Sequence, residues 1–266
     1  MPNEGTPGGP LLRLSKTGVQ EAEFDMSGAV GFNVFAVRPK GGIATVQDER
    51  GYSVVNLGPD GRRESAVHLD AARFFPFQLA VFPSGEILLA GIQRGTRESP
   101  HSNKVFTALY DARGHLVKQL SLDQDPEIER PNESGDVRYV GATTGEDGNV
   151  YLMRRASPAT VYVISSTGEV VRKLVIAPPS AGQTPGAMQA SKNKLAVLFY
   201  NECTARTCKG ASYTVVDTVT GEKLADYVAG GDVGGAFACY APDPDRFFFL
   251  QMSGEHRLEI LEARPR

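Results

Sequence analysis

One hairpin pattern recurs five times along this chain of 266 residues. Each copy consists of an alternating apolar strand, a short polar turn that closes on glycine, and a second strand whose exposed positions carry charge. Glycine adopts a positive φ at the last turn position at little steric cost, so the pattern predicts antiparallel hairpins for a physical reason. The closing glycines recur at spacings of 43, 53, 54 and 53 residues: Gly18, Gly61, Gly114, Gly168 and Gly221.

A second type of hairpin lies between these glycine-closed copies. Its five turns fall at residues 39–42, 83–85, 145–148, 191–193 and 242–245. The first strand of each is rich in small or apolar residues, which suit crowded strands near a central axis: Ala36, Ala80, Gly141, Ala142, Ala190 and Ala238. The alternation of the two types gives about four strands per repeat of ~40–50 residues, which is the blade of a β-propeller.

We therefore predict an all-β fold, a β-propeller of four-stranded antiparallel blades. The hairpin count favours five blades, and six with incomplete terminal blades is the rival. A β-sandwich lacks this two-type alternation, and no segment shows apolar residues at helical spacing.

The two ends of the chain predict how the domain closes. The chain opens on a glycine-closed hairpin at 11–25 and finishes on a hairpin of the other type at 236–251. Pairing of the N- and C-terminal strands would hide their exposed edges. We expect a single domain over 11–266 after a flexible leader at 1–10, although the strand at 256–263 competes with Leu11–Leu14 for one place.

Two segments carry a resemblance to known proteins. Gln78–Leu89 (QLAVFPSGEILL) and Val161–Leu174 (VYVISSTGEVVRKL) resemble blade halves of NHL-like, TolB-like and related bacterial propellers. The likeness covers most of 11–263 and is one of repeat pattern. It implies a propeller fold, and because such families include binding modules, scaffolds and enzymes, it implies no reaction.

Composition narrows the classes of partner. The net charge of −3 lacks the basic excess of a phosphate-seeking surface, so we expect no nucleic acid as a partner. No apolar run approaches the ~20 residues that span a bilayer. The first ten residues lack the charged start and apolar stretch of a signal peptide. Met1 is then either a natural start or the replacement of a removed export signal.

Long polar segments gather at one predicted end of the blades. Both hairpin types turn at the same end, which we call the turn end. The links between second and third strands, and between blades, lie at the opposite link end, and they are unequal in length: 93–103, 122–137, 178–185, 200–211 and 230–235. Function usually resides on such loops, whereas blade geometry needs only short links.

We expect any protein, peptide or small-molecule partner to contact this link end. The bland alternative, drift in tolerant surface loops, stays open. The predicted binding residues are Arg94, Arg97, His101, Asp123, Asp125, Arg138, Arg206 and Asp232.

The acidic stretch within 122–138 is the one candidate for a cofactor. Clustered carboxylates suit Ca²⁺, but no spacing here matches the twelve-residue calcium loop. The simpler interpretation is a solvated acidic loop partly neutralised by Arg130 and Arg138. We expect no metal or other cofactor, with calcium as the alternative.

Cys203 and Cys208 lie in one polar loop. Two exposed free thiols would be a liability, so we predict a disulfide between them, with two unrelated thiols as the alternative. A zinc site would need two further ligands, and none is near in the sequence. A disulfide implies an oxidising compartment, so we expect a periplasmic or secreted bacterial protein. Cys239 is expected to be a buried free thiol in an inner strand.

No catalytic motif is recognisable in the sequence. Nucleophile elbow, phosphate loop and zinc-protease helix patterns do not occur. We expect a monomeric, non-catalytic ligand- or protein-binding or scaffold propeller. The alternative is a propeller hydrolase or lyase, lactonase-like, with its site at the axial opening. That resemblance would require axial Glu, Asn and Asp metal ligands, which cannot be matched here residue by residue.

Overall fold

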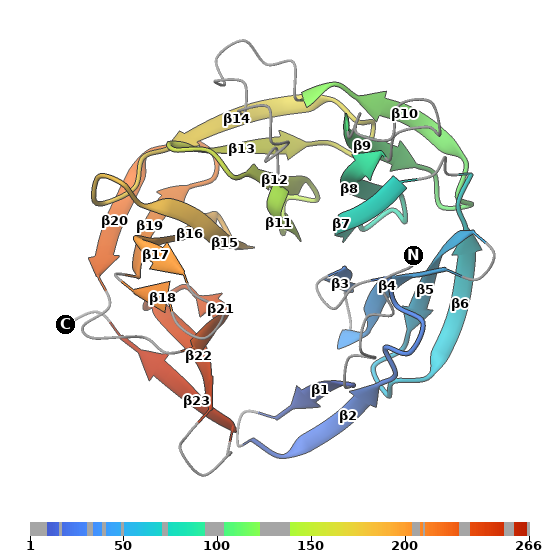
Figure 1. Ribbon diagram of the computed structural model, residues 1–266, viewed down its shortest axis with the longest axis horizontal. Coiled ribbons are helices and arrows are strands. Elements are labelled where there is room, and N and C mark those ends of the chain that lie inside the picture. The colour runs from blue at the N-terminus through green and yellow to red at the C-terminus, as the bar shows by residue number, and fades with distance from the viewer. Residues whose placement is uncertain are drawn as a thin grey trace. The chain divides into compact units, whose positions relative to one another are not determined.

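A computed structural model shows that the chain folds as an all-β protein (Figure 1). The structure describes residues 10–15, 18–30, 34–38, 41–48, 51–70, 74–93, 104–122, 139–203, 208–209, 211–228, 235–252 and 258–264. These residues contain no α-helix, and therefore none that is long and apolar enough to cross a membrane. The predicted fold class is confirmed: the protein is a five-bladed β-propeller of antiparallel blades, and the described residues contain four complete four-stranded blades.

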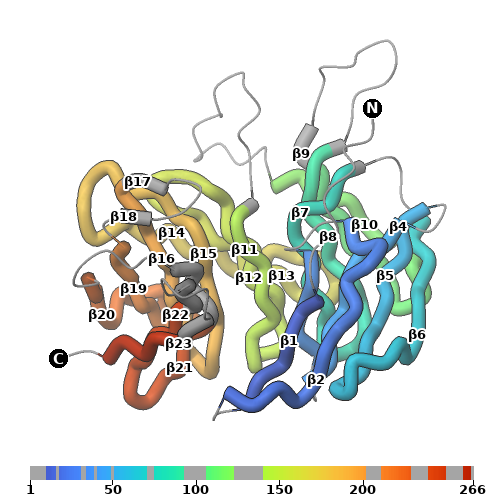
Figure 2. Tube along the Cα trace, turned by 60° about the horizontal axis from the view of Figure 1, so that its bottom comes forward, coloured from blue at the N-terminus to red at the C-terminus, as the bar shows by residue number. Residues whose placement is uncertain are grey.

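The chain divides into two compact units, residues 1–136 and 137–266. The first unit contains one hairpin and two complete blades, in which consecutive strands pair (Figure 2 shows β5 and β6 side by side). Its strands are β1 (Leu11–Leu14), β2 (Gln20–Phe24), β3 (Phe35–Val37), β4 (Ile43–Asp48), β5 (Tyr52–Leu57), β6 (Arg63–His68), β7 (Phe74–Val81), β8 (Ile87–Gln93), β9 (Lys104–Tyr110) and β10 (Leu116–Leu120).

The second unit contains two complete blades, β11–β14 and β15-β16-β19-β20, and the three-stranded sheet β21–β23. A two-stranded sheet, β17–β18, lies within the link between β16 and β19. The strands are β11 (Tyr139–Thr144), β12 (Val150–Arg154), β13 (Ala159–Ile164), β14 (Val170–Ile176), β15 (Thr184–Ser191), β16 (Lys194–Tyr200), β17 (Glu202–Cys203), β18 (Cys208–Lys209), β19 (Ser212–Asp217), β20 (Lys223–Val228), β21 (Gly235–Ala241), β22 (Arg246–Met252) and β23 (Leu258–Ala263).

The ten predicted hairpins are all present, and the glycine-closed turns form for the expected reason. Gly114 has a φ of 91°, and its N–H donates to the carbonyl of Asp111 at 3.0 Å. A Cβ at this position would lie 1.9 Å from the carbonyl oxygen of His68, in the neighbouring blade of the same unit. Glycine is therefore required both by the turn and by the close approach of two blades.

Middle strands are buried on both faces and outer strands on one. Every residue of β12 is buried, whereas most residues of β14 are exposed or half-buried. A middle strand has side chains from neighbouring sheets against both of its faces, so it reads as a continuous apolar run. The core of each unit consists of such strands packed sheet against sheet.

Two strands begin earlier than the sequence predicts. β7 begins at Phe74 and β15 at Thr184, whereas the sequence before the turns at 83–85 and 191–193 predicts strands only from Leu79 and Met188. Each extension contains a proline, Pro76 or Pro185, which argues against a strand because proline donates no ladder hydrogen bond. The structure accommodates both at register shifts typical of β-bulges.

The expected closure of the domain pairs strands from the two units. Within each unit, β1 pairs with β2 and β22 pairs with β23. The pairing of the chain's ends and the single domain over 11–266 stay predictions.

Candidate functional site

The eight predicted binding residues lie outside the described part of the chain, so their role stays a prediction: Arg94, Arg97, His101, Asp123, Asp125, Arg138, Arg206 and Asp232. The acidic stretch weighed for calcium lies outside it as well. Among the described residues, no group of three or more His, Cys, Asp or Glu could hold a metal ion.

The segment 200–211, expected to be a loop, contains the short antiparallel pair β17–β18. Its register places Cys203 directly opposite Cys208. Directly opposed residues in an antiparallel pair have Cα atoms about 4.5–5.5 Å apart, within the range of about 4.4–6.8 Å that a disulfide bridges. The register suits the predicted disulfide, which itself stays a prediction.

Cys239, in β21, is a free thiol, as expected. It is half-buried rather than fully buried, and burial raises the pKa of its thiol. A thiol held in its protonated form is a weak nucleophile.

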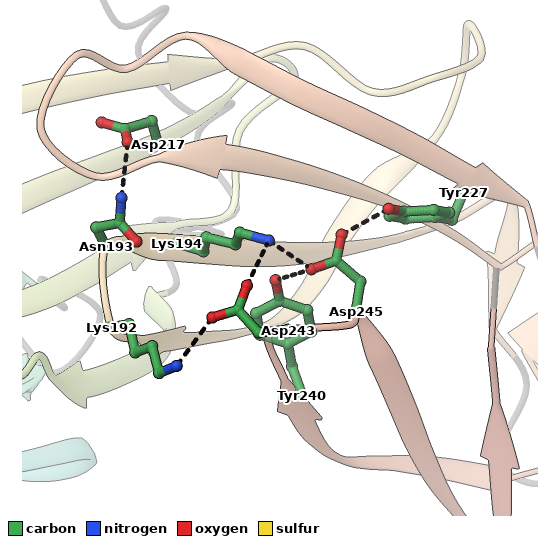
Figure 3. A network of polar contacts seen from close by, with 8 residues as sticks. All are labelled: Lys192, Asn193, Lys194, Asp217, Tyr227, Tyr240, Asp243 and Asp245. Carbon is green, nitrogen blue, oxygen red and sulfur yellow. Dashed lines mark hydrogen bonds and ion pairs between the residues drawn. The ribbon is translucent and has the colours of Figure 1, made fainter.

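A polar network joins the turns of the second unit (Figure 3). Lys192 Nζ, in the β15–β16 turn, lies 2.8 Å from Asp243 Oδ2 in the β21–β22 turn. Lys194 Nζ lies 2.9 Å from Asp245 Oδ1 and 3.6 Å from Asp243 Oδ1. These ion pairs connect two neighbouring sheets at the turn end, and we call these residues, with Asn193, Asp217, Tyr227 and Tyr240, the turn-end network.

Asp245 is the centre of this network. Its carboxylate accepts hydrogen bonds from Tyr227 Oη and Tyr240 Oη, each at 2.6 Å, in addition to Lys194. Burial of Asp245 favours the neutral acid, but the hydrogen bonds from both tyrosines and Lys194 outweigh it, so the pKa of Asp245 is lowered. The pKa of Tyr227 is raised to about 12, mainly by burial and then by its bond to Asp245.

A second group of contacts ties three turns together. The carbonyl of Asn193 accepts the N–H of Thr218 at 2.8 Å, and Asn193 Nδ2 donates to Asp217 Oδ2 at 3.2 Å. Glu146 Oε1 accepts the N–H of Lys192 at 3.1 Å. Hydrogen bonds from the backbone of Thr220 and Val219 lower the pKa of Asp217. The acidic groups of these turns thus already accept hydrogen bonds from the chain itself, which is the arrangement of a structural clamp.

At the link end of the second unit, Gln183 connects three segments. Its Oε1 accepts the N–H of Ser180 at 3.2 Å and the hydroxyl of Ser212 at 2.8 Å, and its carbonyl accepts Ser157 Oγ at 3.4 Å. Gln183 itself is 2% exposed. The side chain and the backbone carbonyl of the buried Gln183 therefore hold together the links after β12 and β14 and the start of β19.

Arg154, the last residue of β12, is different. It is 2% exposed, and its buried Nη1 has no hydrogen-bond partner among the described residues. Among the described residues, no carboxylate forms an ion pair with it. It lies opposite Thr160 of β13, which is also buried. A guanidinium offers a planar fork of donors that matches carboxylates and other oxyanions.

Sequence reasoning missed Arg154. Its signal is its position: β12 is an apolar run that ends at Arg154, and Arg154 continues the buried strand. A lone charge at a strand end usually reaches solvent, so burial could be found only from the structure.

The comparisons with known proteins support the fold. No protein-family model matches the sequence, and the search of curated proteins finds no match. Among solved structures, hydrazine synthase of Kuenenia stuttgartiensis is 14% identical at a TM-score of 0.55, over 90% of this chain and 64% of that one. A protein of unknown function from Bacteroides caccae is 15% identical at a TM-score of 0.54, over 98% of this chain and 88% of that one. The chain thus spans less than two thirds of the first of these proteins, and at such identity the likeness shows the fold alone: the resemblance to β-propellers is confirmed.

Proposed function

We propose that this chain is a non-catalytic binding or scaffold propeller that meets its partner at the link end. One contrast within the second unit supports the proposal. The acidic groups of the turn-end network accept hydrogen bonds from the chain's own lysines, tyrosines and backbone. At the link end of the β11–β14 blade, the buried guanidinium of Arg154 has an Nη1 with no hydrogen-bond partner in the described part of the chain.

The turn-end network and Arg154 also differ in how their polar atoms are paired. Buried polar groups are nearly always hydrogen-bonded, and each exception needs an explanation such as a bound ion or ligand. The turn-end network offers no such exception among its described contacts, which suits a structural role. The links are unequal in length in the sequence, which blade geometry does not require.

We propose further that the protein works as a monomer in an oxidising compartment, periplasmic or extracellular. The opposed register of Cys203 and Cys208 supports the oxidising compartment. Mass spectrometry of the exported, unreduced protein after alkylation is expected to show neither thiol of this pair modified. Alkylation of both would contradict the disulfide and remove the argument for that compartment.

The location of binding is tested by exchanging links. Segments 94–103 and 123–136 are replaced by short Gly-Ser connections in one variant, and the turn residues 83–85 and 145–148 are altered in another. Both immobilised variants and the native chain are then offered the same cell-envelope extract, and the captured proteins are quantified. Partners lost with the exchanged links but retained with the altered turns support the proposal, and unchanged capture by a folded link variant contradicts it.

The same variants test the hydrolase or lyase alternative. The native chain is assayed against lactones and p-nitrophenyl esters. Turnover that survives purification and scales with protein concentration would favour the enzyme and contradict a purely binding role.

A further inference from the structure

We infer that Arg154 is the centre of an anion-binding site at the link end of the β11–β14 blade, and that it takes a carboxylate of the bound ligand. This inference deepens the proposed function and rests on it for the identity of the partner. The site itself stands on separate observations of burial, pairing and position.

The first observation is that three more exposed arginines of the chain form ion pairs and the buried Arg154 does not, among the described residues. Arg13, Arg38 and Arg264 form ion pairs with Glu21, Glu64 and Glu262, and their side chains are between 29% and 67% exposed. Arg154 is 2% exposed and has no ion pair among the described residues. Arginine stays charged in proteins, and burial of an unpaired charge is strongly unfavourable. The arginine that most needs a counter-charge therefore has none among the residues that the structure describes.

The second observation is the position of Arg154 on the sheet. It pairs with Thr160 on the adjacent strand. Directly opposed residues of an antiparallel pair have their side chains on the same face, with Cβ atoms about 4.5–5.5 Å apart. Thr160 is 4% exposed. A guanidinium and a hydroxyl thus share one buried face, and both can donate to an oxyanion.

The third observation is the support of the backbone beside Arg154. The N–H of Ala156 donates to the carbonyl of Arg154 at 3.0 Å. Ser157, in the same link, bonds to Gln183, which also binds Ser212 of β19. The link that follows Arg154 is therefore anchored to the next blade, which pre-organises the site and reduces the entropy lost on binding.

The chemistry of the site favours a carboxylate over a phosphate. The whole chain carries a net charge of −3, so it lacks the basic excess that is typical of phosphate-binding surfaces. One guanidinium matches one carboxylate in a two-bond planar arrangement. The ligand is then a carboxylate-bearing small molecule or peptide group.

The test compares Arg154→Met with a matched control, Arg155→Met, since Arg155 is the adjacent, exposed arginine. The full chain is unfolded thermally in acetate, succinate, phosphate or sulfate, with sodium chloride at equal ionic strength as the reference. A ligand that binds only the native state raises Tm with its concentration. Because the chain has no tryptophan, tyrosine fluorescence and circular dichroism report the transition.

We expect acetate and succinate to raise the Tm of the native chain and of Arg155→Met above the chloride reference, and to leave that of Arg154→Met unchanged. In chloride, Arg154→Met is expected to melt higher than the native chain, because an unpaired buried charge has been removed. Arg154→Gln, which keeps a neutral polar group, is a second folded variant that should also lose the carboxylate response.

Three results would overturn the inference. They are a native chain that responds equally to carboxylates and chloride, a response that survives in Arg154→Met, and a response to phosphate or sulfate with none to carboxylates. Failure of the proposed function is separate: partner capture that persists when the links are exchanged contradicts that function even where the carboxylate response of Arg154 is present. Conversely, capture lost with the exchanged links leaves the proposed function standing where the carboxylate response is absent.

Discussion

The middle strand β16 serves two different interfaces with its two faces. Leu195, Val197 and Phe199 pack against the β11–β14 blade in an almost wholly apolar cluster. Ala196 and Leu198 alternate with them and point to the other face of β16. There they lie in a cluster with aromatic residues of β19, β21 and β22: Tyr213, Tyr240, Phe247 and Phe249. The first interface is apolar, and the second combines rings with the turn-end network.

The difference follows from residue size. The small side chain of Ala196 leaves room on one face for the rings of Tyr213 and Phe247, whose centroids lie 4.2 Å apart. Tyr227 and Tyr240 then bring hydroxyls to Asp245. A buried tyrosine needs a partner for its hydroxyl, so an aromatic interface requires a polar centre that an aliphatic one does not. The two interfaces should therefore respond differently to substitution, acid and salt.

The largest effect is expected in the apolar interface. Phe199 is fully buried, so Phe199→Ala should lower the free energy of unfolding by about 3–5 kcal/mol through lost burial and a cavity. Urea denaturation measures it. Val219→Ala, at a position 64% exposed, is the control and should change stability by less than about 0.5 kcal/mol. Equal losses in both variants would show that this cluster is not a tightly packed core.

A smaller effect is expected at the polar centre of the aromatic interface. Asp245→Asn replaces one acceptor oxygen by an amide that faces Tyr227, Tyr240 or Lys194, and the loss should be about 1–3 kcal/mol. Asp243→Asn is the matched control. The side chain of Asp243 is 58% exposed and that of Asp245 is 11% exposed, so the control should lose much less. A larger loss for Asp243→Asn would place the centre of the network elsewhere.

Acid should separate the two interfaces. The pKa of Asp245 is lower in the folded protein than its ordinary value, so the unfolded state binds more protons between the two values. The stabilisation is complete above the unfolded pKa of about 3.9 and is lost as pH falls through the folded pKa. Asp217 and Asp243 also have lowered pKa values and add in the same direction.

Urea midpoints at pH 7 and at pH 3 test this expectation. The drop between them should be smaller in Asp245→Asn than in the native chain, and unchanged in Phe199→Ala. An identical drop in Asp245→Asn would remove the carboxylate from the explanation.

The fold could be predicted from the sequence because its signal is repeated. Five glycine-closed turns, each with a reason for glycine at its last position, determine five hairpins regardless of what surrounds them. The strand starts at Phe74 and Thr184 could not, because Pro76 and Pro185 are tolerated only through register shifts that depend on the partner strand.

The candidate site was much less predictable. The turn-end network depends on Lys194 and Asp245, which are 51 residues apart and meet only when two sheets pack. Arg154 is an ordinary strand-terminal arginine in the sequence, and its burial is a tertiary property. The loop residues expected to bind a partner lie outside the described part of the chain.

The smallest effect is expected at the exposed edge of the turn-end network. Salt should abolish this effect while leaving the effect at Lys194 largely intact. Lys192 and Asp243 form an ion pair whose side chains are both more than half exposed, and such pairs contribute little and are screened. Lys194 is 23% exposed and binds the buried carboxylate of Asp245. Lys192→Met should therefore change the urea midpoint slightly at low salt and not measurably in 1 M NaCl, where the Debye length is about 3 Å. Lys194→Met should keep most of its larger loss in 1 M NaCl, because its removal leaves the carboxylate of Asp245 without its cation. If both variants lost their effect in salt, the aromatic interface would be stabilised by its rings alone, and the polar centre would be a consequence of their packing rather than a contributor to it.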